Sequence, residues 1–135
     1  MQHTTQYQFN LMEGTDKFLP GPLNENMEKV EAALSKQLQL VLGTYSGTGR
    51  YGSTNPNSLT FDFTPYLLII SADGGYHAVW FRGMTSGMTN NSNTYGSSIT
   101  WEDKTVTWFT SAGSAAYQLN LSDRIYRYLA VGLNP

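Results

Sequence analysis

The sequence predicts a mainly β protein: an antiparallel β-sandwich of six to eight strands, preceded by one short N-terminal helix. From residue 39 onward, short runs alternate apolar and polar residues, and turn-forming residues separate these runs every eight to twelve positions. Before that point, one stretch places apolar residues at helical spacing. With 135 residues, of which 40% are hydrophobic, the chain is large enough for one such domain plus a small appendage.

Residues 1–22 are expected to form an extended N-terminal lead. They show no sustained hydrophobic period, and they end in Pro20-Gly21-Pro22. Closely spaced prolines lack the amide hydrogens and the backbone freedom that a helix interior needs, so this segment is predicted not to be helical.

Residues 23–38 are expected to form a helix. Asn24 is the predicted N-cap, and Glu25 and Glu28 suit the positive end of the helix dipole. Apolar residues recur at steps of four, three, four and four, at Leu23, Met27, Val30, Leu34 and Leu38.

This apolar stripe is narrow, close to the a/d pattern of two heptads. An isolated helix of this length is only marginally stable in water, so the stripe must pack on something. Two packings fit: the helix lies against the chain's own β domain, or it forms a short parallel coiled coil that joins copies of the chain. In the second case, the five apolar residues form the oligomer interface, and residues 39–135 form a β-sandwich tip domain.

Eight candidate strands follow the helix. They are Gln39–Tyr45, Ser58–Phe63, Tyr66–Ala72, His77–Arg82, Ser97–Trp101, Thr105–Thr110, Ala115–Leu119 and Tyr126–Val131. Hairpin turns are expected at Asp73-Gly74-Gly75, where glycine is free to adopt positive φ, and at Glu102-Asp103-Lys104. Trp80, Trp101 and Trp108 lie on these strands, where core packing or a subunit interface is expected.

The composition disfavours several partners. Charged residues make up only 13% of the chain, so Ser, Thr, Asn and Gly must supply most of the surface polarity. The net charge is −2 and no basic run occurs, which argues against nucleic-acid binding. No apolar run reaches membrane-spanning length, so no membrane insertion is expected. The polar start, MQHTTQYQFN, lacks the apolar region of a secretory signal peptide, so synthesis in a cytoplasm is expected.

The titratable residues form no recognisable catalytic pattern. His3 and His77 are the two histidines, and no G-x-S-x-G motif supplies a nucleophile for a Ser–His–Asp arrangement of His77 and Asp73. The acidic residues of the strand region lie mostly at turns, which disfavours the paired carboxylates of a glycosidase. Cysteine is absent, and no metal-ligand spacing occurs. We therefore expect no catalytic residue, no metal and no cofactor, and a binding module rather than an enzyme.

Two Gly/Ser/Thr/Asn-rich loops, one that includes residues 50–57 and one at 83–96, carry side chains that are suited to binding sugars. An exposed tyrosine ring offers an apolar face to the C–H face of a pyranose, while amide, hydroxyl and guanidinium groups hydrogen-bond its hydroxyls. The candidate ligand-binding residues are Arg50, Tyr51, Asn55 and Asn57 in the first loop, Asn90, Asn91, Asn93 and Tyr95 in the second, and Arg82. Asparagine and glycine are also common turn residues, so a purely structural role is the alternative for the loop positions. Arg82 is a candidate for either an interface or a ligand contact.

Several segments resemble tail-fibre-type proteins of phages and prophages from Gram-positive, clostridia-like gut bacteria. The lead YQFNLMEGTD and the following PLNENMEKVEAAL resemble their N-terminal segment. The body resembles the small β-sandwich tip domain of the same proteins, through SGTGRYGSTNPNSLTFDFTPYLLII, ITWEDKTVTW, SAAYQLN and IYRYLAVG. The pattern F-x-F-x-P before an apolar strand, with a Tyr-rich last strand that ends in Ala-Val-Gly, also resembles H-type lectins.

The resemblance implies a homotrimeric receptor-binding protein of a phage tail, made in the host cytoplasm and carried on the virion. It implies adhesion to a host cell-surface glycan through the β-sandwich, and contacts with other tail or baseplate proteins. The alternative is a structural virion subunit, in the baseplate or associated with a fibre, that binds no glycan. The chain is short for a fibre and has no shaft repeat, which suits a compact tip or a minor subunit.

Overall fold

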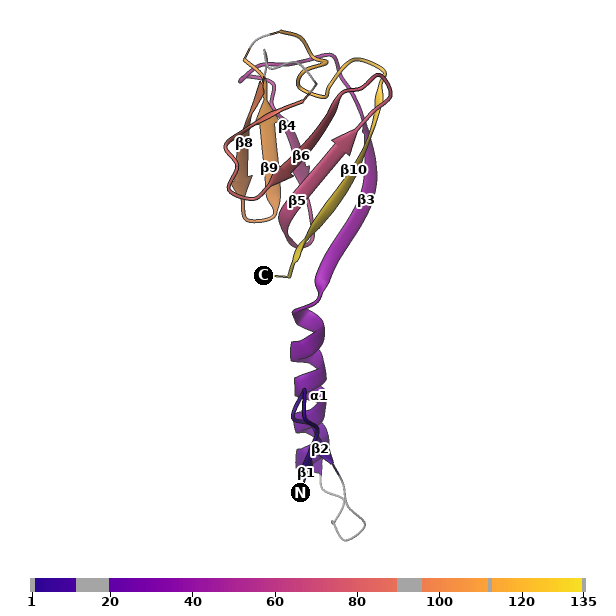
Figure 1. Ribbon diagram of the computed structural model, residues 1–135, viewed down its shortest axis with the longest axis vertical. Coiled ribbons are helices and arrows are strands. Elements are labelled where there is room, and N and C mark those ends of the chain that lie inside the picture. The colour runs from indigo at the N-terminus through magenta and orange to yellow at the C-terminus, as the bar shows by residue number, and fades with distance from the viewer. Residues whose placement is uncertain (1, 12–19, 90–95, 112, 135) are drawn as a thin grey trace. The chain divides into compact units, whose positions relative to one another are not determined.

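The computed structural model describes residues 2–11, 20–89, 96–111 and 113–134. The chain divides into two compact units, Met1–Gln37 and Leu38–Pro135 (Figure 1). The first unit holds the helix, and the second holds two four-stranded antiparallel sheets. The expected fold class, a mainly β antiparallel sandwich with one short helix near the N-terminus, is confirmed.

In the first unit, the N-terminal lead folds back on itself. Strands β1 (Gln2–His3) and β2 (Asn10–Leu11) pair antiparallel, and β2 packs on helix α1 (Pro20–Ser35). The backbone N–H of Asn10 donates to Oδ1 of Asn26 (2.7 Å), and Nδ2 of Asn26 donates to the carbonyl of Asn10 (2.9 Å). This reciprocal pair satisfies a backbone donor and acceptor of the short strand, and so ties the lead to the helix.

Helix α1 begins and ends earlier than the sequence indicated. Pro20 is its first residue and Pro22 its third. The expectation that these prolines exclude a helix is wrong, because the first turn does not use its amide hydrogens and tolerates the proline ring. Asn24 therefore lies inside the helix and is not its N-cap, and Leu38 lies beyond it in the next strand. No described helix residue is buried, and the helix stripe is exposed at Leu23, Met27, Val30 and Leu34.

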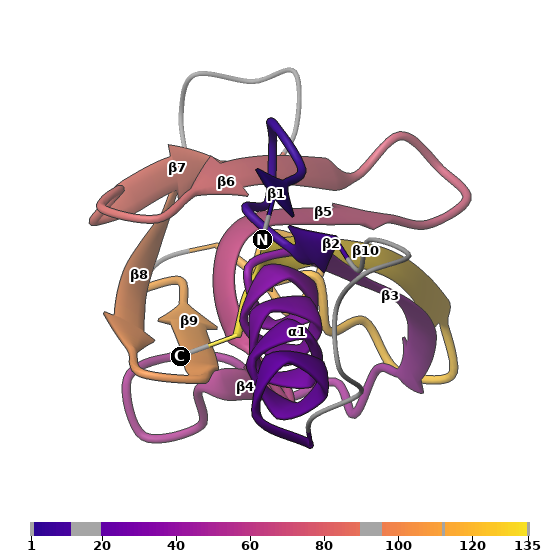
Figure 2. The ribbon, with the colours of Figure 1, turned by 90° about the horizontal axis from the view of Figure 1, so that it is seen from below.

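The second unit is a sandwich of two sheets (Figures 1 and 2). The first sheet has the order β3-β10-β5-β6, with β3 (Leu38–Ser46), β10 (Ile125–Leu133), β5 (Thr64–Ser71) and β6 (His77–Phe81). The second sheet has the order β4-β9-β8-β7, with β4 (Asn57–Thr60), β9 (Thr105–Phe109), β8 (Gly96–Glu102) and β7 (Ser86–Met88). Because β3 and β4 belong to different sheets, the loop between them crosses the end of the sandwich.

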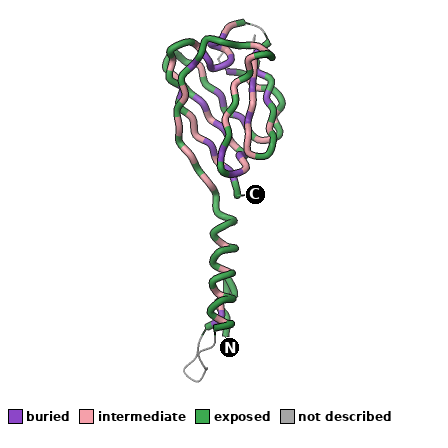
Figure 3. Tube along the Cα trace, turned by 180° about the vertical axis from the view of Figure 1, so that it is seen from behind, coloured by how far each residue is buried: buried purple, intermediate pink, exposed green. Residues whose placement is uncertain are grey.

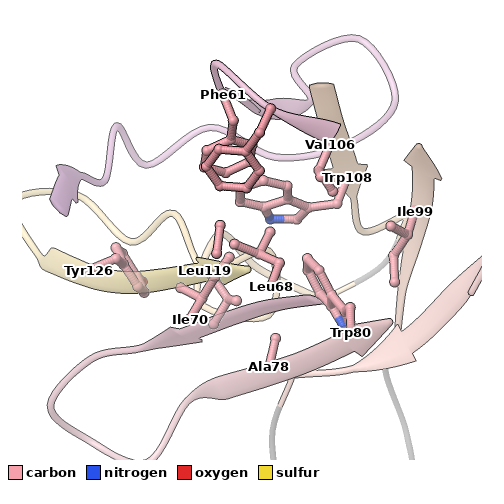
Figure 4. Close-up of a cluster of buried hydrophobic side chains, with 12 residues drawn as sticks. Phe61, Leu68, Ile70, Ala78, Trp80, Ile99, Val106, Trp108, Leu119 and Tyr126 are labelled. Atoms are coloured by element: carbon pink, nitrogen blue, oxygen red, sulfur yellow. The ribbon is translucent and has the colours of Figure 1, made fainter. Parts of the chain in front are cut away.

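The core lies between the two sheets, and a pair of tryptophans occupies it (Figure 4). Trp80 of β6 and Trp108 of β9 meet edge to face, with ring centroids 5.5 Å apart, and both are buried. Leu68 and Ile70 of β5 and Val106 of β9 pack around them. Alternate residues of a strand point to opposite faces, so buried and exposed positions alternate along the strands (Figure 3). The core packing expected for these two tryptophans is confirmed.

One expected strand, Ala115–Leu119, is not a strand. The segment forms consecutive turns, in which the N–H of Leu119 donates to Ala116 (3.1 Å) and the N–H of Asn120 donates to Ala115 (2.8 Å). Leu119 adopts a left-handed backbone with φ of 58°, which a strand does not permit. The expectation is wrong because the apolar residues of this segment are buried by packing against the sandwich, not by pairing in a sheet.

A short strand lies inside the loop that was expected at 83–96. Strand β7 pairs with β8 at Ser86, Gly87 and Met88, residues that carry little β propensity. The hairpin turns expected at 73–75 and 102–104 are confirmed, since each joins two strands that pair with each other.

Gly43→Ala is expected to destabilise the sandwich. Gly43 of β3 lies opposite Tyr128 of β10, and a Cβ atom at this position falls on the Tyr128 ring. Over-packing of this kind costs about 1–3 kcal/mol, which a shift of the urea midpoint measures by tryptophan fluorescence. Gly21→Ala in α1, where a Cβ meets no neighbour, is the matched control and does not lower the midpoint. Equal midpoints for both variants contradict the described packing of Tyr128.

Candidate functional site

A hollow of about 540 Å³ lies beside loop 47–56, which connects β3 to β4. Three of the predicted ligand residues line it: Arg50 and Asn55 from the loop, and Asn57 from the start of β4. Tyr51 is exposed on the same loop but does not line the hollow. Three of the four residues in the first predicted group are thus brought together in space, and Tyr51 lies outside the lining.

The lining of the hollow mixes rings and aliphatic groups with neutral polar groups. The apolar part comes from Tyr45, Pro56, Leu59 and Trp108. The polar part beyond the predicted residues comes from Ser46, Thr48, Ser58 and Asn120. Arg50 is the one charged residue among the described residues of this lining. Such a surface offers hydrogen-bond donors and acceptors and apolar faces, with little electrostatic field.

The buried side chain of Gln118 fixes the middle and the end of loop 47–56. Its Oε1 accepts hydrogen bonds from the N–H groups of Gly52 (2.9 Å) and Thr110 (3.0 Å). Its Nε2 donates to the carbonyl of Asn55 (2.7 Å) and to Oδ1 of Asn57 (3.0 Å). Every donor and both acceptor positions of this carboxamide are therefore used, which a fully buried amide requires.

Asn120 fixes the start of the same loop. Its Oδ1 accepts from the N–H of Thr48 (3.0 Å), and its Nδ2 donates to Oγ1 of Thr48 (2.8 Å) and to the carbonyl of Arg50 (2.8 Å). The N–H of Gly49 also donates to the carbonyl of Asn120 (2.7 Å). With both amides in place, the backbone that carries Arg50 and Asn55 is held before any ligand arrives, which lowers the ordering cost of binding.

Two stacked tyrosines lie behind the hollow. The rings of Tyr45 and Tyr126 have centroids 5.1 Å apart, and the hydroxyl of Tyr45 donates to the carbonyl of Leu119 (2.7 Å). The N–H of Leu121 donates to the hydroxyl oxygen of Tyr126 (3.0 Å). Burial raises the pKa of Tyr45 far above its ordinary value, and the neighbouring Tyr126 raises it further. Burial also raises the pKa of Tyr126, so both phenols keep their protons to a higher pH than an exposed tyrosine does.

Arg82 lies at a second hollow, of about 400 Å³, whose lining shares no residue with the first. Its Nη1 donates to the carbonyls of Pro65 (3.0 Å) and Asp103 (3.2 Å), and its guanidinium lies 5.6 Å from the ring centroid of Tyr66. These contacts tie the end of β6 to the turn between β8 and β9. The ligand or interface role expected for Arg82 stays a prediction. The other candidates, Asn90, Asn91, Asn93 and Tyr95, lie outside the described residues.

Sequence reasoning missed the two residues that hold the site in place. Gln118 and Asn120 lie in and beside Ala115–Leu119, the predicted strand, and a strand gives no reason to place their side chains at loop 47–56. The available signal was the pattern Q-x-N within an apolar stretch, since polar amides that become buried need several partners.

Over residues 2–11, 20–89, 96–111 and 113–134, acidic, histidine and cysteine side chains form no group of three that suits a metal ion. In the same part of the chain, no helix is both long and apolar enough to cross a membrane. Comparison with protein-family models, with curated proteins and with solved structures finds no match for this chain.

Gln118→Ala is expected to release loop 47–56. The change removes the side-chain oxygen that accepts from the N–H groups of Gly52 and Thr110, at a cost of about 2–4 kcal/mol in the free energy of unfolding. Limited trypsin digestion followed by mass spectrometry measures the release directly, because Arg50 is a cleavage point inside the loop. Faster cleavage at Arg50 is the expected result. The control is Ser53→Ala, at an exposed position of the same loop, and equal cleavage rates in the two variants contradict the clamp.

The tyrosine pair predicts a loss of stability at alkaline pH. In the unfolded chain each phenol ionises near its ordinary pKa of about 10. In the folded state Tyr45 and Tyr126 keep their protons, so stability is full below this pH and falls above it, by up to about 1.4 kcal/mol per pH unit for each group. Urea midpoints between about pH 8 and pH 11 measure the slope. Tyr45→Phe reduces the slope, whereas Ser53→Ala, an exposed change that removes no titratable group, leaves it as in the wild type.

Proposed function

We propose that this chain is an adhesion protein that binds a neutral glycan of a host cell surface in the hollow beside loop 47–56. The observation that carries the proposal is the lining, where amides, hydroxyls and aromatic rings surround the hollow with one charged residue, Arg50. Neutral sugars are bound by hydrogen bonds to their hydroxyls and by packing of apolar rings on their C–H faces. A stronger field would add little to the affinity for an uncharged ligand.

The dimensions and the rigidity of the site support this proposal. Small-molecule sites in proteins are typically about 300–1,000 Å³, and the volume of this hollow, about 540 Å³, lies in that range. The two buried amides, Gln118 and Asn120, hold the loop that presents Arg50 and Asn55. The free-energy cost of ordering the site on binding is then small, so a modest number of contacts yields measurable affinity.

The setting that we propose is a phage tail, following the resemblance of the sequence to tail-fibre-type proteins. In this setting the chain is a homotrimeric receptor-binding protein, and its partners are a host cell-surface glycan and other tail proteins. A single shallow site binds a sugar weakly. Linking three sites in one particle multiplies the effective affinity for a surface that repeats the same glycan.

A structural virion subunit, in the baseplate or associated with a fibre, is the competing proposal. The exposed helix stripe favours it, because an apolar stripe of this kind fits a helix of another tail protein as well as a second copy. The two proposals differ in what the purified protein binds. Binding to host cells or to their wall polysaccharide supports adhesion, whereas binding to a tail or baseplate protein alone supports the structural role.

Arg50→Ala and Asn55→Ala are each expected to weaken glycan binding about tenfold, the effect of losing one net hydrogen bond of about 1.4 kcal/mol. A glycan array identifies the ligand, and titration calorimetry with that glycan measures the change. Both side chains line the hollow, so the fold and the urea midpoint stay as in the wild type. Lys104→Ala, which removes a cation at the β8–β9 turn, is the control and leaves affinity unchanged. Unchanged affinity in both hollow variants places the glycan elsewhere.

A further inference from the structure

The two sheets of the sandwich differ in the chemistry of their outer faces. On the second sheet the outward positions are mostly hydroxyl residues: Ser58, Thr60, Ser98, Thr100, Thr105 and Thr107. We call this the hydroxyl face. Four of these hydroxyls pair across the strands: Oγ1 of Thr60 with Oγ1 of Thr105 (2.9 Å), and Oγ1 of Thr107 with Oγ of Ser58 (3.5 Å). A face of this composition is suited to contact with solvent.

The outer face of the first sheet is the opposite in character. Two complete rows of side chains cross it, with one residue from each of the four strands in each row. The first row is Leu40, Val131, Leu67 and Phe81, and the second is Leu42, Leu129, Ile69 and Val79. Leu38 and Leu133 pair beyond the first row. These ten residues are called the apolar face, and the polar row of Thr44, Arg127, Ser71 and His77 borders it.

The apolar face is too large to be an ordinary patch on a monomer. The exposed fraction is 72% at Leu38, 63% at Leu40 and 74% at Leu42. With about 200 Å² for a fully exposed large side chain, the six most exposed residues of this face (Leu38, Leu40, Leu42, Val79, Phe81 and Leu133) together expose roughly 700 Å². The largest apolar patch on a typical monomer is about 300–600 Å². Each partner in a protein–protein interface of standard size buries about 800 Å².

Strand β3 also lacks the devices that protect a solvent-facing edge strand. It is a nine-residue strand at the end of the sheet order, and it contains no charged residue and no proline. Natural edge strands of this length usually carry lysine, proline or a bulge, which prevent pairing with other chains. Both the face and the outer edge of β3 are therefore suited to contact with another polypeptide.

We propose that the apolar face packs against the equivalent faces of other copies of this chain, in a threefold assembly. An apolar face without charged residues carries no charge pattern with which to select an unlike partner. Copies of one chain, in contrast, bring matching apolar faces by symmetry. Interfaces between identical subunits are also the more apolar class, comparable to a domain core cut in half.

The width of the sheet suits closure around a threefold axis. Four strands at a spacing of about 4.8 Å form a sheet roughly 19 Å wide. Three such sheets, placed as the sides of a triangular prism, lie about 5.5 Å from the axis by simple geometry. This is close to half of the roughly 10 Å that separates packed sheets. The side chains of three apolar faces then fill the prism at ordinary packing distances.

The helix stripe precedes this face along the chain and favours the same partner. Leu34 is the last residue of the stripe and Leu38 is the first of the apolar face, with residues 35–37 between them. A parallel coiled coil of helix stripes joins the β-sandwiches of different copies through short tethers, which raises their effective concentration. The helix then selects like chains, and the apolar face supplies most of the buried area. The threefold number rests on the proposed function, whereas the glycan plays no part in this inference.

The test compares charges placed on the two faces of the full-length chain. Wild type is expected to have a molar mass near three times 15.0 kDa by light scattering. Leu40→Asp with Leu42→Asp is expected to shift the mass toward that of one chain at micromolar concentration. Thr100→Asp with Thr107→Asp, which makes the same chemical change on the hydroxyl face, leaves the mass unchanged. A monomeric wild type, or an unchanged mass in the apolar-face variant, overturns the proposal.

A cross-linking experiment keeps the proposal testable if the Asp variant fails to fold. The natural chain has no cysteine, so single cysteine variants react at one place only. Leu129→Cys, in the second row of the apolar face, is expected to form covalent dimers with a short bis-maleimide. Thr107→Cys on the hydroxyl face is expected to form none. Equal yields overturn the proposal. Binding of free glycan, measured on the same samples, reports on the hollow separately, so failure of the interface and failure of the proposed function are distinguishable.

Discussion

The candidate site depends on one constraint, the need of a buried carboxamide to satisfy all of its hydrogen-bonding groups. Gln118 is fully buried and meets this need only when loop 47–56 and the start of β4 lie where they do. An unpaired buried amide group costs several kcal/mol, so the loop cannot move away piece by piece. The same residue accepts from Thr110 at the end of β9 and so joins the loop to the second sheet. The position of Arg50 over the hollow follows from this arrangement.

The sequence was sufficient for the fold class and for part of the lining of the hollow, because both rest on local signals. Period-two alternation predicts strands wherever one face is buried, and Trp80 and Trp108 on such strands point to the core. Arg50, Asn55 and Asn57 are close in sequence, so one short loop brings them together. Contacts between residues that are far apart in the sequence left no local pattern from which they could be predicted.

The misassigned strand and the outward leucines of β3 have a common physical origin, since an apolar pattern does not itself specify sheet pairing or the buried face. Ala115–Leu119 is rich in apolar residues because its turns bury Ala115, Ala116 and Leu119, and the left-handed backbone of Leu119 leaves no mark in composition. The run Leu38–Leu42 alternates correctly as a strand, yet its leucines face outward. Which face of a strand turns to the core depends on register with neighbouring strands, which the run itself does not contain.

Trp108 belongs to two environments at once. Its ring packs edge to face on Trp80 in the core, its Nε1 donates to the carbonyl of Gln118 (2.8 Å), and the same side chain borders the hollow. A ligand that binds in the hollow displaces water next to the indole of Trp108, whose orientation is fixed by these contacts. The intrinsic tryptophan fluorescence of the protein therefore reports whether the hollow is occupied, and no added fluorophore is needed.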